Sequence, residues 1–399
     1  MRDHLARFGL LPAIFVAISA TTIAPSADSR RSTRDPAGLV AHEWGTFTSI
    51  AGEAGQAVEW QPAQAPSELP CFVRRVRVGA KGLLSGTVRM ETPVIYFYAP
   101  TDVTVNAKVR FKEGAISEWY PQAAVTPASI EPGKFARPGF ESTIEWSDIK
   151  VTPRVAENFP TDSLSSHYYA ARRTDAAPLQ VGREQEKFLF YRGVGRFTPP
   201  LTAIVRDDDA IDVRNDTGEA LGTLVLFENR GGTIRYQIRQ ATGASVRLTG
   251  ESPQGELTEL YDALERMLVS AGLYPKEAAA MVATWRDSWF EEGTRIFYIV
   301  PRANIDTVLP LDIRPRPVET TRVFVGRMEL MTRRTLDDLK GAILRNDRPA
   351  LYKYGRFFTP IVDRIRARAS FEDLGVIQRQ LPSIYGSWPW TPTACPQSP

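Results

Sequence analysis

The stretch Ala41-His42-Glu43-Trp44-Gly45-Thr46-Phe47-Thr48 marks the point where the mature fold is predicted to begin. The residues before it have the composition of an export signal followed by a polar leader. The residues after it form a long series of short segments with strand-like alternation. The stretch also holds one of only three histidines in the chain, beside a carboxylate and a tryptophan. We therefore predict that the first strand of the fold lies here.

The first 27 residues are typical of a secretory signal. Arg2 and Arg7 give a positive start, residues 8–20 form a short apolar core, and small residues from Ala20 to Ala27 offer cleavage sites. An apolar run of about 13 residues is too short to cross a bilayer. We expect a periplasmic or secreted protein with a flexible leader over residues 28–41 and no membrane span once the signal is removed.

Composition limits the classes of partner. The chain has 399 residues, a hydrophobic fraction of 43% and a net charge of +3. This hydrophobic fraction is sufficient for a packed core. Positive charges are scattered and do not form a basic stripe interleaved with aromatic residues, so nucleic acid is not an expected partner.

Alternation with a period of two residues dominates from residue 42 to residue 250. Residues 94–98 form an apolar run typical of a strand buried on both faces, and residues 103–111 alternate strictly. Residues 112–114 are predicted to form a hairpin turn into the strand 115–120, and residues 229–232 a second hairpin turn. Frequent turn signals between short strands predict an antiparallel β-sandwich-like region over 42–250.

The period changes to that of a helix after residue 256. Residues 257–271 have helical spacing and end at Gly272, and Pro275 begins a second helix that carries Trp285 and Trp289 on its apolar face. Strands follow at 295–300 and 321–328, with further helices after them. The predicted fold is therefore mainly β, with a mixed α+β C-terminal part over 251–385 and an irregular tail over 386–399.

The two histidines that remain after signal removal, His42 and His167, are the first candidates for chemistry. Two imidazoles with a carboxylate such as Glu43 could hold zinc and leave a position open for water. However, neighbouring residues of a strand point to opposite faces, so His42 and Glu43 share a site only if the chain bends between them. An isolated histidine is more often a packed or surface residue.

Acidic residues give two further candidate sites. Two carboxylates across a cleft lined by aromatic rings are what a glycosidase requires. Four glutamates lie beside strand-like apolar residues, and aromatic residues follow Glu118 and Glu145 directly: Glu91, Glu118, Glu145 and Glu186. A separate acidic segment that includes Asp207, Asp209 and Asp212 offers oxygen ligands for calcium, although it lacks the spacing of an EF-hand and is more typical of a solvated turn.

Cys71 and Cys395 are the only cysteines of the chain. Export places them in an oxidising compartment, where a disulfide between them is favoured over two free thiols. Such a bond would join the C-terminal tail to the early β region.

The motif His-Glu-Trp-Gly-Thr-Phe at residues 42–47 resembles that of a group of secreted bacterial proteins without an assigned activity. Residues 91–98, 118–121, 187–193 and 285–301 are also similar to that group, so the resemblance covers most of the mature chain. It implies an exported bacterial protein and assigns no catalytic residue.

Two hypotheses for function follow. The first is a binding or structural module for an extracytoplasmic ligand, either a glycan or a partner protein. The alternative is an extracytoplasmic hydrolase that depends on a metal or on carboxylates and uses His42 and His167, with Glu43 or Glu118 as the acidic partner. The sequence does not decide whether the protein is an enzyme, and zinc and calcium are the cofactors that its candidate ligands would suit.

Overall fold

The structure is a computed structural model, and it describes residues 38–61, 69–79, 84–162, 166–215, 217–218, 220, 222–249 and 252–388. The chain divides into two units, residues 1–34 and 35–399, and every described residue belongs to the second. The predicted signal, most of the predicted leader and the end of the tail therefore lie outside the described residues.

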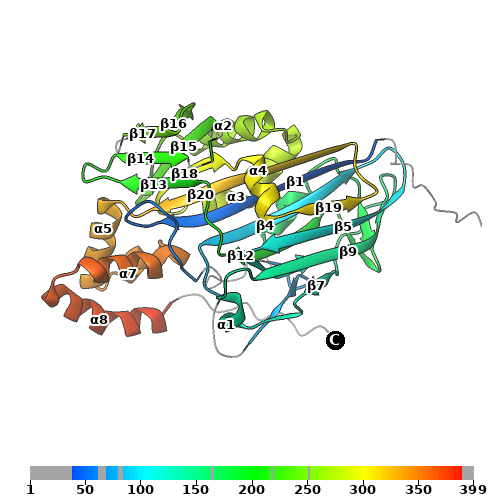
Figure 1. Cartoon of the computed structure of the whole chain (residues 1–399). Coiled ribbons are helices and arrows are strands. Elements are labelled where there is room, and N and C mark those ends of the chain that lie inside the picture. The colour runs from blue at the N-terminus through cyan, green and yellow to red at the C-terminus, as the bar shows by residue number, and fades with distance from the viewer. Residues whose placement is uncertain are drawn as a thin grey trace, which may run out of the picture. The chain divides into compact units, whose positions relative to one another are not determined.

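A nine-stranded sheet forms the centre of the fold (Figure 1). In spatial order its strands are β16 (Thr233–Ala241), β15 (Gly222–Arg230), β18 (Gly293–Ile299), β20 (Glu319–Leu330), β1 (Val40–Ala51), β4 (Val88–Tyr98), β12 (Leu189–Gly195), β6 (Gly114–Tyr120) and β2 (Arg74–Arg75).

The predicted first strand, β1, lies inside this sheet. It pairs with β4 in antiparallel orientation and with β20 in parallel orientation, and β20 is more than 260 residues further along the chain. Because β18 and β20 come from the predicted C-terminal part, the nine-stranded sheet crosses the boundary that we placed at residue 250.

A second sheet of antiparallel strands packs against one face of the first. Its strands are β11 (Glu184–Glu186), β10 (Leu179–Val181), β9 (Glu141–Val151), β5 (Val103–Lys112) and β19 (Leu311–Arg314), with β7 (Ala124–Thr126) on β9. Alternate residues of both sheets, among them Phe47, Ile95, Val109 and Trp146, form the apolar core between them. This is the sandwich that the alternation predicts.

Smaller strands complete the β structure. A three-stranded sheet contains β13 (Leu201–Val205), β14 (Ile211–Asn215) and β17 (Ser245–Leu248), and a short parallel pair contains β3 (Arg77–Val78) and β8 (Ser129–Ile130).

Helices cover the other face of the nine-stranded sheet. Helix α2 (Leu257–Ser270) and helix α3 (Pro275–Trp289) pack there on Trp44, Val94 and Phe297, and Gly272 follows α2 with a positive φ of 113°. Trp285 and Trp289 are buried in this cluster, as their helical spacing predicts. The short segment η2 (His167–Arg172) packs against α3 on this same face, while α1 (Pro132–Phe135) contributes Phe135 to the core between the two sheets.

The C-terminal helices gather at one end of the strands (Figure 1). They are α5 (Arg333–Leu344), α6 (Arg348–Tyr352), η3 (Gly355–Phe357), α7 (Phe358–Arg368) and α8 (Phe371–Gly386), while α4 (Arg302–Val308) follows β18. The C-terminal group has its own apolar core, which Ile50 at the end of β1 joins. The prediction of a mainly β fold with a mixed helical and strand C-terminal part is confirmed.

One predicted hairpin is wrong. The segment 112–114 does not join two paired strands, because β5 belongs to the second sheet and β6 to the nine-stranded sheet. Glu113 has a positive φ of 53° and turns the chain from one sheet to the other. The hairpin at residues 229–232 is confirmed, since β15 and β16 pair directly across Gly231 and Gly232.

Candidate functional site

His42 and Glu43 point to opposite faces of the nine-stranded sheet, as the alternation of a strand predicts. The Nδ1 atom of His42 lies 2.8 Å from Oε2 of Glu277 on α3. The same carboxylate accepts hydrogen bonds from the Tyr98 hydroxyl at 2.8 Å and from the Tyr274 backbone N–H at 2.8 Å. A carboxylate only accepts, so Nδ1 is the donor, and His42 is held in a buried cluster on the helical face.

His167 lies in a different place. Its Nε2 atom is 2.9 Å from Oδ2 of Asp287, and both side chains are solvent-exposed. Asp287 and Glu277 are ten positions apart on α3, which corresponds to about 15 Å along a helix axis. The structure therefore does not bring His42 and His167 together in the shared site that the hydrolase hypothesis requires.

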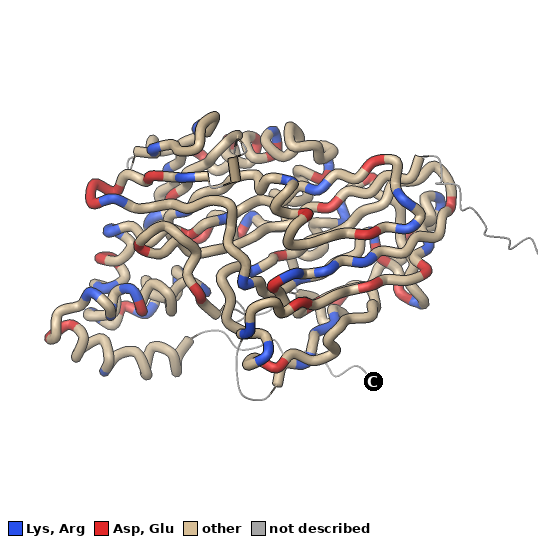
Figure 2. Tube along the Cα trace, in the orientation of Figure 1, with Lys and Arg blue, Asp and Glu red and all other residues tan. Residues whose placement is uncertain are grey.

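The acidic residues between β13 and β14 and at the start of β14 pair with arginines. Figure 2 marks the acidic and basic positions along the chain. Asp209 accepts hydrogen bonds from the Arg333 backbone N–H at 3.3 Å, and Asp212 lies 2.6 Å from Nε of Arg206. Asp207 is 3.7 Å from the Arg333 guanidinium. Among the residues that the structure describes, no group of three or more His, Cys, Asp or Glu side chains is placed to hold a metal ion.

The four candidate glutamates lie in three different places. Glu145 pairs with Lys108 on the surface at 3.1 Å, and buried Glu186 accepts from Arg172 at 2.6 Å and from Tyr168 at 3.0 Å. Glu91 and Glu118 lie on the helical face of the nine-stranded sheet, on strands separated by β12. Sequence reasoning selected these glutamates but not the arginines that surround them.

Cys395 lies outside the described residues, so the Cys71–Cys395 disulfide stays a prediction.

Glu43 reaches the sandwich side of the sheet, where it positions an arginine. It accepts hydrogen bonds from the Tyr191 hydroxyl and from Nε of Arg322. Arg322 also donates from Nη1 to Asp306 at 2.7 Å, and its side chain is 1% exposed. Burial alone would lower the pKa of Arg322, but Glu43 raises this pKa above its usual value. Arg322 is therefore a fixed cation held by the first strand.

Two cavities share Arg322 and Arg302 in their walls. One has a volume of about 460 Å³ and lies between α4, β19 and the start of β20. The other has a volume of about 620 Å³ and lies beyond the end of β18, where α2 and the β15–β16 hairpin form its sides. We call them the paired cavities. Volumes of this size are typical of small-molecule sites.

The walls of the paired cavities carry more positive than negative charge. Among the described lining residues of both cavities, five are arginines and two are aspartates: Arg266, Arg302, Arg314, Arg316 and Arg322, with Asp306 and Asp312. The described lining of the larger cavity contains no acidic side chain. Asp306 already pairs with Arg302 at 2.8 Å and with Arg322, while Asp312 pairs with Arg314 at 3.1 Å. The excess charge favours an anionic ligand.

Neutral polar and apolar groups lie next to these arginines. The larger cavity contains Thr223, Gln240 and Ser270 together with the side chains of Met267 and Val323. Hydroxyl and amide groups beside apolar surface suit a ligand that has both hydroxyl groups and C–H faces. No motif identified these residues in advance, because they come from four separate elements, β15, β16, α2 and β20, that meet only in the folded chain.

Comparisons with known proteins add little. No protein-family model matches this chain, and a search of curated proteins found no relative. Among solved structures, the chain is similar to the yeast delta-COP-I mu-homology domain complexed with a Dsl1 WxWxV peptide, at 8% sequence identity and a TM-score of 0.28, covering 74% of this chain and 98% of that one. Likeness at this level does not establish a common fold.

In the described part of the chain, no helix has the length and apolar character needed to cross a membrane.

Proposed function

We propose that the protein is an exported binding module that holds an acidic sugar unit of an extracytoplasmic glycan in the paired cavities. The observation that carries this proposal is the set of five arginines against two aspartates in the cavity walls. A carboxylate or phosphate group on the ligand would bind to guanidinium groups, which present paired N–H donors.

The choice of a sugar follows from the neutral groups beside the arginines. Hydroxyl groups of a sugar need hydrogen-bond partners, and Thr223, Gln240 and Ser270 supply them. The C–H face of a sugar ring would lie on apolar side chains such as Met267. The cavities are small compared with the area that a folded partner protein buries, so a protein ligand would insert only a short acidic segment.

The arrangement also gives a role to the first strand. Glu43 fixes Arg322 from the sandwich side, and Asp306 fixes it from α4. A cation that is held in place before binding loses little conformational entropy when the ligand arrives.

The test is calorimetric titration with matched acidic and neutral oligosaccharides. Arg266 and Arg316 are exposed on the cavity walls, so Arg266→Gln and Arg316→Gln should leave the fold intact. We expect binding of at least one acidic oligosaccharide and a loss of about tenfold in affinity for each variant, since one charged hydrogen bond contributes about 1.5 kcal/mol. Arg379→Gln on α8 serves as the matched control and should bind normally.

Equal affinity for neutral and acidic sugars, or full binding by both cavity variants, would contradict the proposal. Binding of an acidic peptide and of no oligosaccharide would replace the glycan by a partner protein.

A further inference from the structure

A band of buried polar residues crosses the helical face of the nine-stranded sheet. Along β1 this face carries Trp44, then Thr46 and Thr48, then Ile50. Trp44 belongs to the apolar cluster of α2 and α3, and Ile50 belongs to the apolar cluster of the C-terminal helices. Both threonines are fully buried between these clusters. We call this band the polar seam.

Thr48 has an arginine on each side. Its register partners are Arg89 on β4 and Arg327 on β20. Directly paired residues of adjacent strands point to the same face. With about 4.8 Å between strands, the backbones of Arg89 and Arg327 are only about 10 Å apart. Two like charges therefore flank one hydroxyl group in a buried place.

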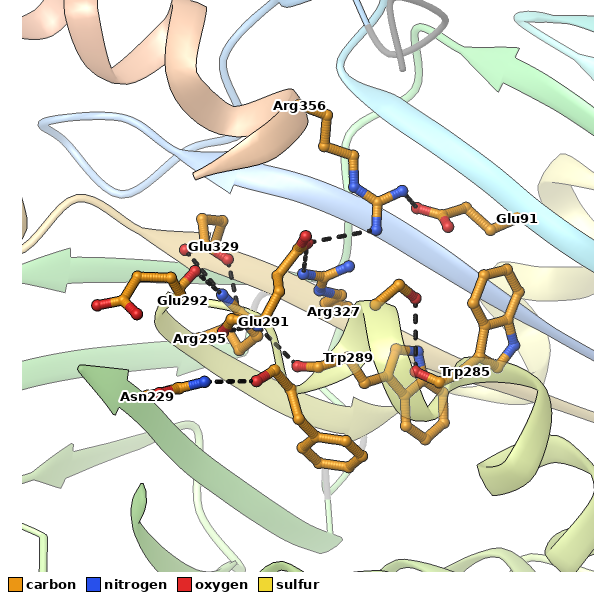
Figure 3. A network of polar contacts seen from close by, with 12 residues as sticks. Glu91, Asn229, Trp285, Trp289, Glu291, Glu292, Arg295, Arg327, Glu329 and Arg356 are labelled. Carbon is orange, nitrogen blue, oxygen red and sulfur yellow. Dashed lines mark hydrogen bonds and ion pairs between the residues drawn. The ribbon is translucent and has the colours of Figure 1, made fainter. Parts of the chain in front are cut away.

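Residues from the helical side reach over the seam (Figure 3). Arg356 donates from Nη1 to Glu91 at 2.8 Å, and Arg327 donates from Nη2 to Glu291 at 2.7 Å. The ring of Phe357 lies 4.9 Å from the Arg327 guanidinium carbon. Next to the seam, Arg295 and Glu329 form their own buried ion pair at 2.8 Å.

The seam carries excess positive charge. Among the described residues, it contains four arginines and three glutamates: Arg89, Arg192, Arg327 and Arg356, with Glu91, Glu118 and Glu291. Burial, and after it the neighbouring guanidiniums, lower the pKa of Arg89 and of Arg327 to about 10. Burial would raise the pKa of Glu91, but the surrounding arginines hold it at about 2. Repulsion between guanidinium groups therefore contributes to both lowered arginine pKa values.

Several polar atoms of the seam have no hydrogen-bond partner in the structure. They are Nε and Nη1 of Arg327, Nε of Arg192, and the hydroxyl oxygens of Thr46 and Thr48. Arg192 is held nearby by a 3.1 Å bond from Nη2 to the hydroxyl of Thr92, which has a positive φ of 46°. Buried donors without partners are rare in folded proteins and indicate a bound ion or water.

We propose that the polar seam binds one small oxyanion, a carboxylate, phosphate or sulfate group, over Thr48 between Arg89 and Arg327. The oxygens of such an anion accept from Arg327 Nε–H, Arg327 Nη1–H and the threonine hydroxyls, which are the groups left without partners. Water would satisfy the same donors, but an anion would also offset the repulsion between the guanidinium groups. This site is separate from the paired cavities and does not depend on the proposed glycan.

The first measurement is thermal unfolding of the mature protein with phosphate, sulfate or acetate at constant ionic strength. We expect at least one of them to raise Tm along a saturable curve, because a ligand that binds only the folded state stabilises it by mass action. Anion analysis after denaturation of the protein as purified should release about one equivalent of an oxyanion per chain if the buried site retains its ligand. The identity of that anion distinguishes an inorganic ion from an organic carboxylate.

Thr48→Val is the decisive variant. Valine keeps the shape of threonine and removes a hydroxyl that has no protein partner, so the fold should be retained. We expect a loss of about tenfold in anion affinity, the effect of one hydrogen bond to a charged group. Thr294→Val, at another buried threonine of the same sheet, is the control and should bind the anion as the wild type does.

The proposal is overturned if none of the three anions shifts Tm and denaturation releases none. An equal shift in wild type and Thr48→Val also overturns it, because the anion would then bind elsewhere. Arg316→Gln should leave the anion effect unchanged, so failure of the glycan proposal and failure of this one can be told apart.

Discussion

Glu43 and Arg322 are register partners on the parallel strands β1 and β20, and their side chains form an ion pair in the sandwich interior. Both side chains are at most 1% exposed. The pair joins the first strand of the fold to the last strand of the central sheet, and it places Arg322 at the paired cavities.

Loss of the Glu43 charge should destabilise the fold strongly. Glu43→Gln preserves the shape of the side chain but removes the buried acidic partner of Arg322 and leaves it the half-exposed Asp306. We expect a loss of about 3–5 kcal/mol in the free energy of unfolding. Urea denaturation measures this loss. Asp306→Asn removes the second acidic partner of Arg322, and the Asp306 side chain is 48% exposed. This substitution should lower the free energy of unfolding by less than about 1 kcal/mol. Equal effects of the two substitutions would show that burial does not set the strength of this pair.

Glu91 should make the stability of the protein depend on acid pH. Its pKa is about 2 in the folded chain against an ordinary value of 4.5, so the ionised form stabilises the fold. The contribution is complete above pH 4.5, amounts to about 3 kcal/mol, and is lost as the pH falls toward 2. The difference in unfolding free energy between wild type and Glu91→Gln should therefore be constant from pH 6 to 8 and shrink below pH 4.5. Glu372→Gln, at an exposed position of α8, is the control, and a difference that grows in acid would contradict the prediction.

Gly326 should not tolerate a side chain. It lies opposite Tyr298 in the central sheet, and a Cβ atom at this position would be 2.1 Å from the tyrosine ring. We expect Gly326→Ala to lower the free energy of unfolding by about 2–3 kcal/mol, the usual cost of overpacking a core. The double variant with Tyr298→Leu should recover part of the loss. Gly133→Ala in α1, where the added Cβ meets nothing within 4 Å, is the matched control.

The predicted Cys71–Cys395 disulfide should appear in the exported protein. Peptide mapping without reduction should find one peptide pair that contains both cysteines, and Cys395→Ser should lower Tm. On the chain-entropy model the bond contributes at most about 5 kcal/mol. Recovery of both cysteines as free thiols from protein that has been exported would contradict the prediction.

The predicted signal should be removed during export. N-terminal sequencing of the protein from the periplasmic or culture fraction should begin shortly after Ala20, Ala24 or Ala27. Intact Met1 on protein confined to the cytoplasm would remove the extracytoplasmic setting of the proposed function.

The sequence predicts well which side chains share a face of a strand or helix, and poorly which strands pair with one another. Alternation places His42 and Glu43 on opposite faces, and helical spacing buries Trp285 and Trp289, because both patterns are local. Neither pattern contains the pairing of β1 with β20, since alternation shows which side chains share a face and not which strand lies beside them. The hairpin predicted at 112–114 is wrong for the same reason.

The same limit applies to the candidate sites. Glu91 and Glu118 could be selected as carboxylates beside strands, but the surrounding arginines are brought to them by register across the sheet and by η3. Arg322 and Arg327 look like ordinary charged residues of an alternating strand in the sequence. Only the parallel pairing with β1 shows that both are buried, one on each face.

The parallel pairing of β1 and β20 has a consequence for the order in which the protein can form. A chain that is synthesised or exported from its N-terminus presents β1 early, yet the partner on one edge of β1 arrives only with residues 319–330. Until then the central sheet has an open edge and the contacts of the Glu43 side chain are incomplete. Contacts between segments so far apart in sequence form slowly. The chain therefore reaches its final fold only after nearly all of it has emerged, because β20 completes the central sheet.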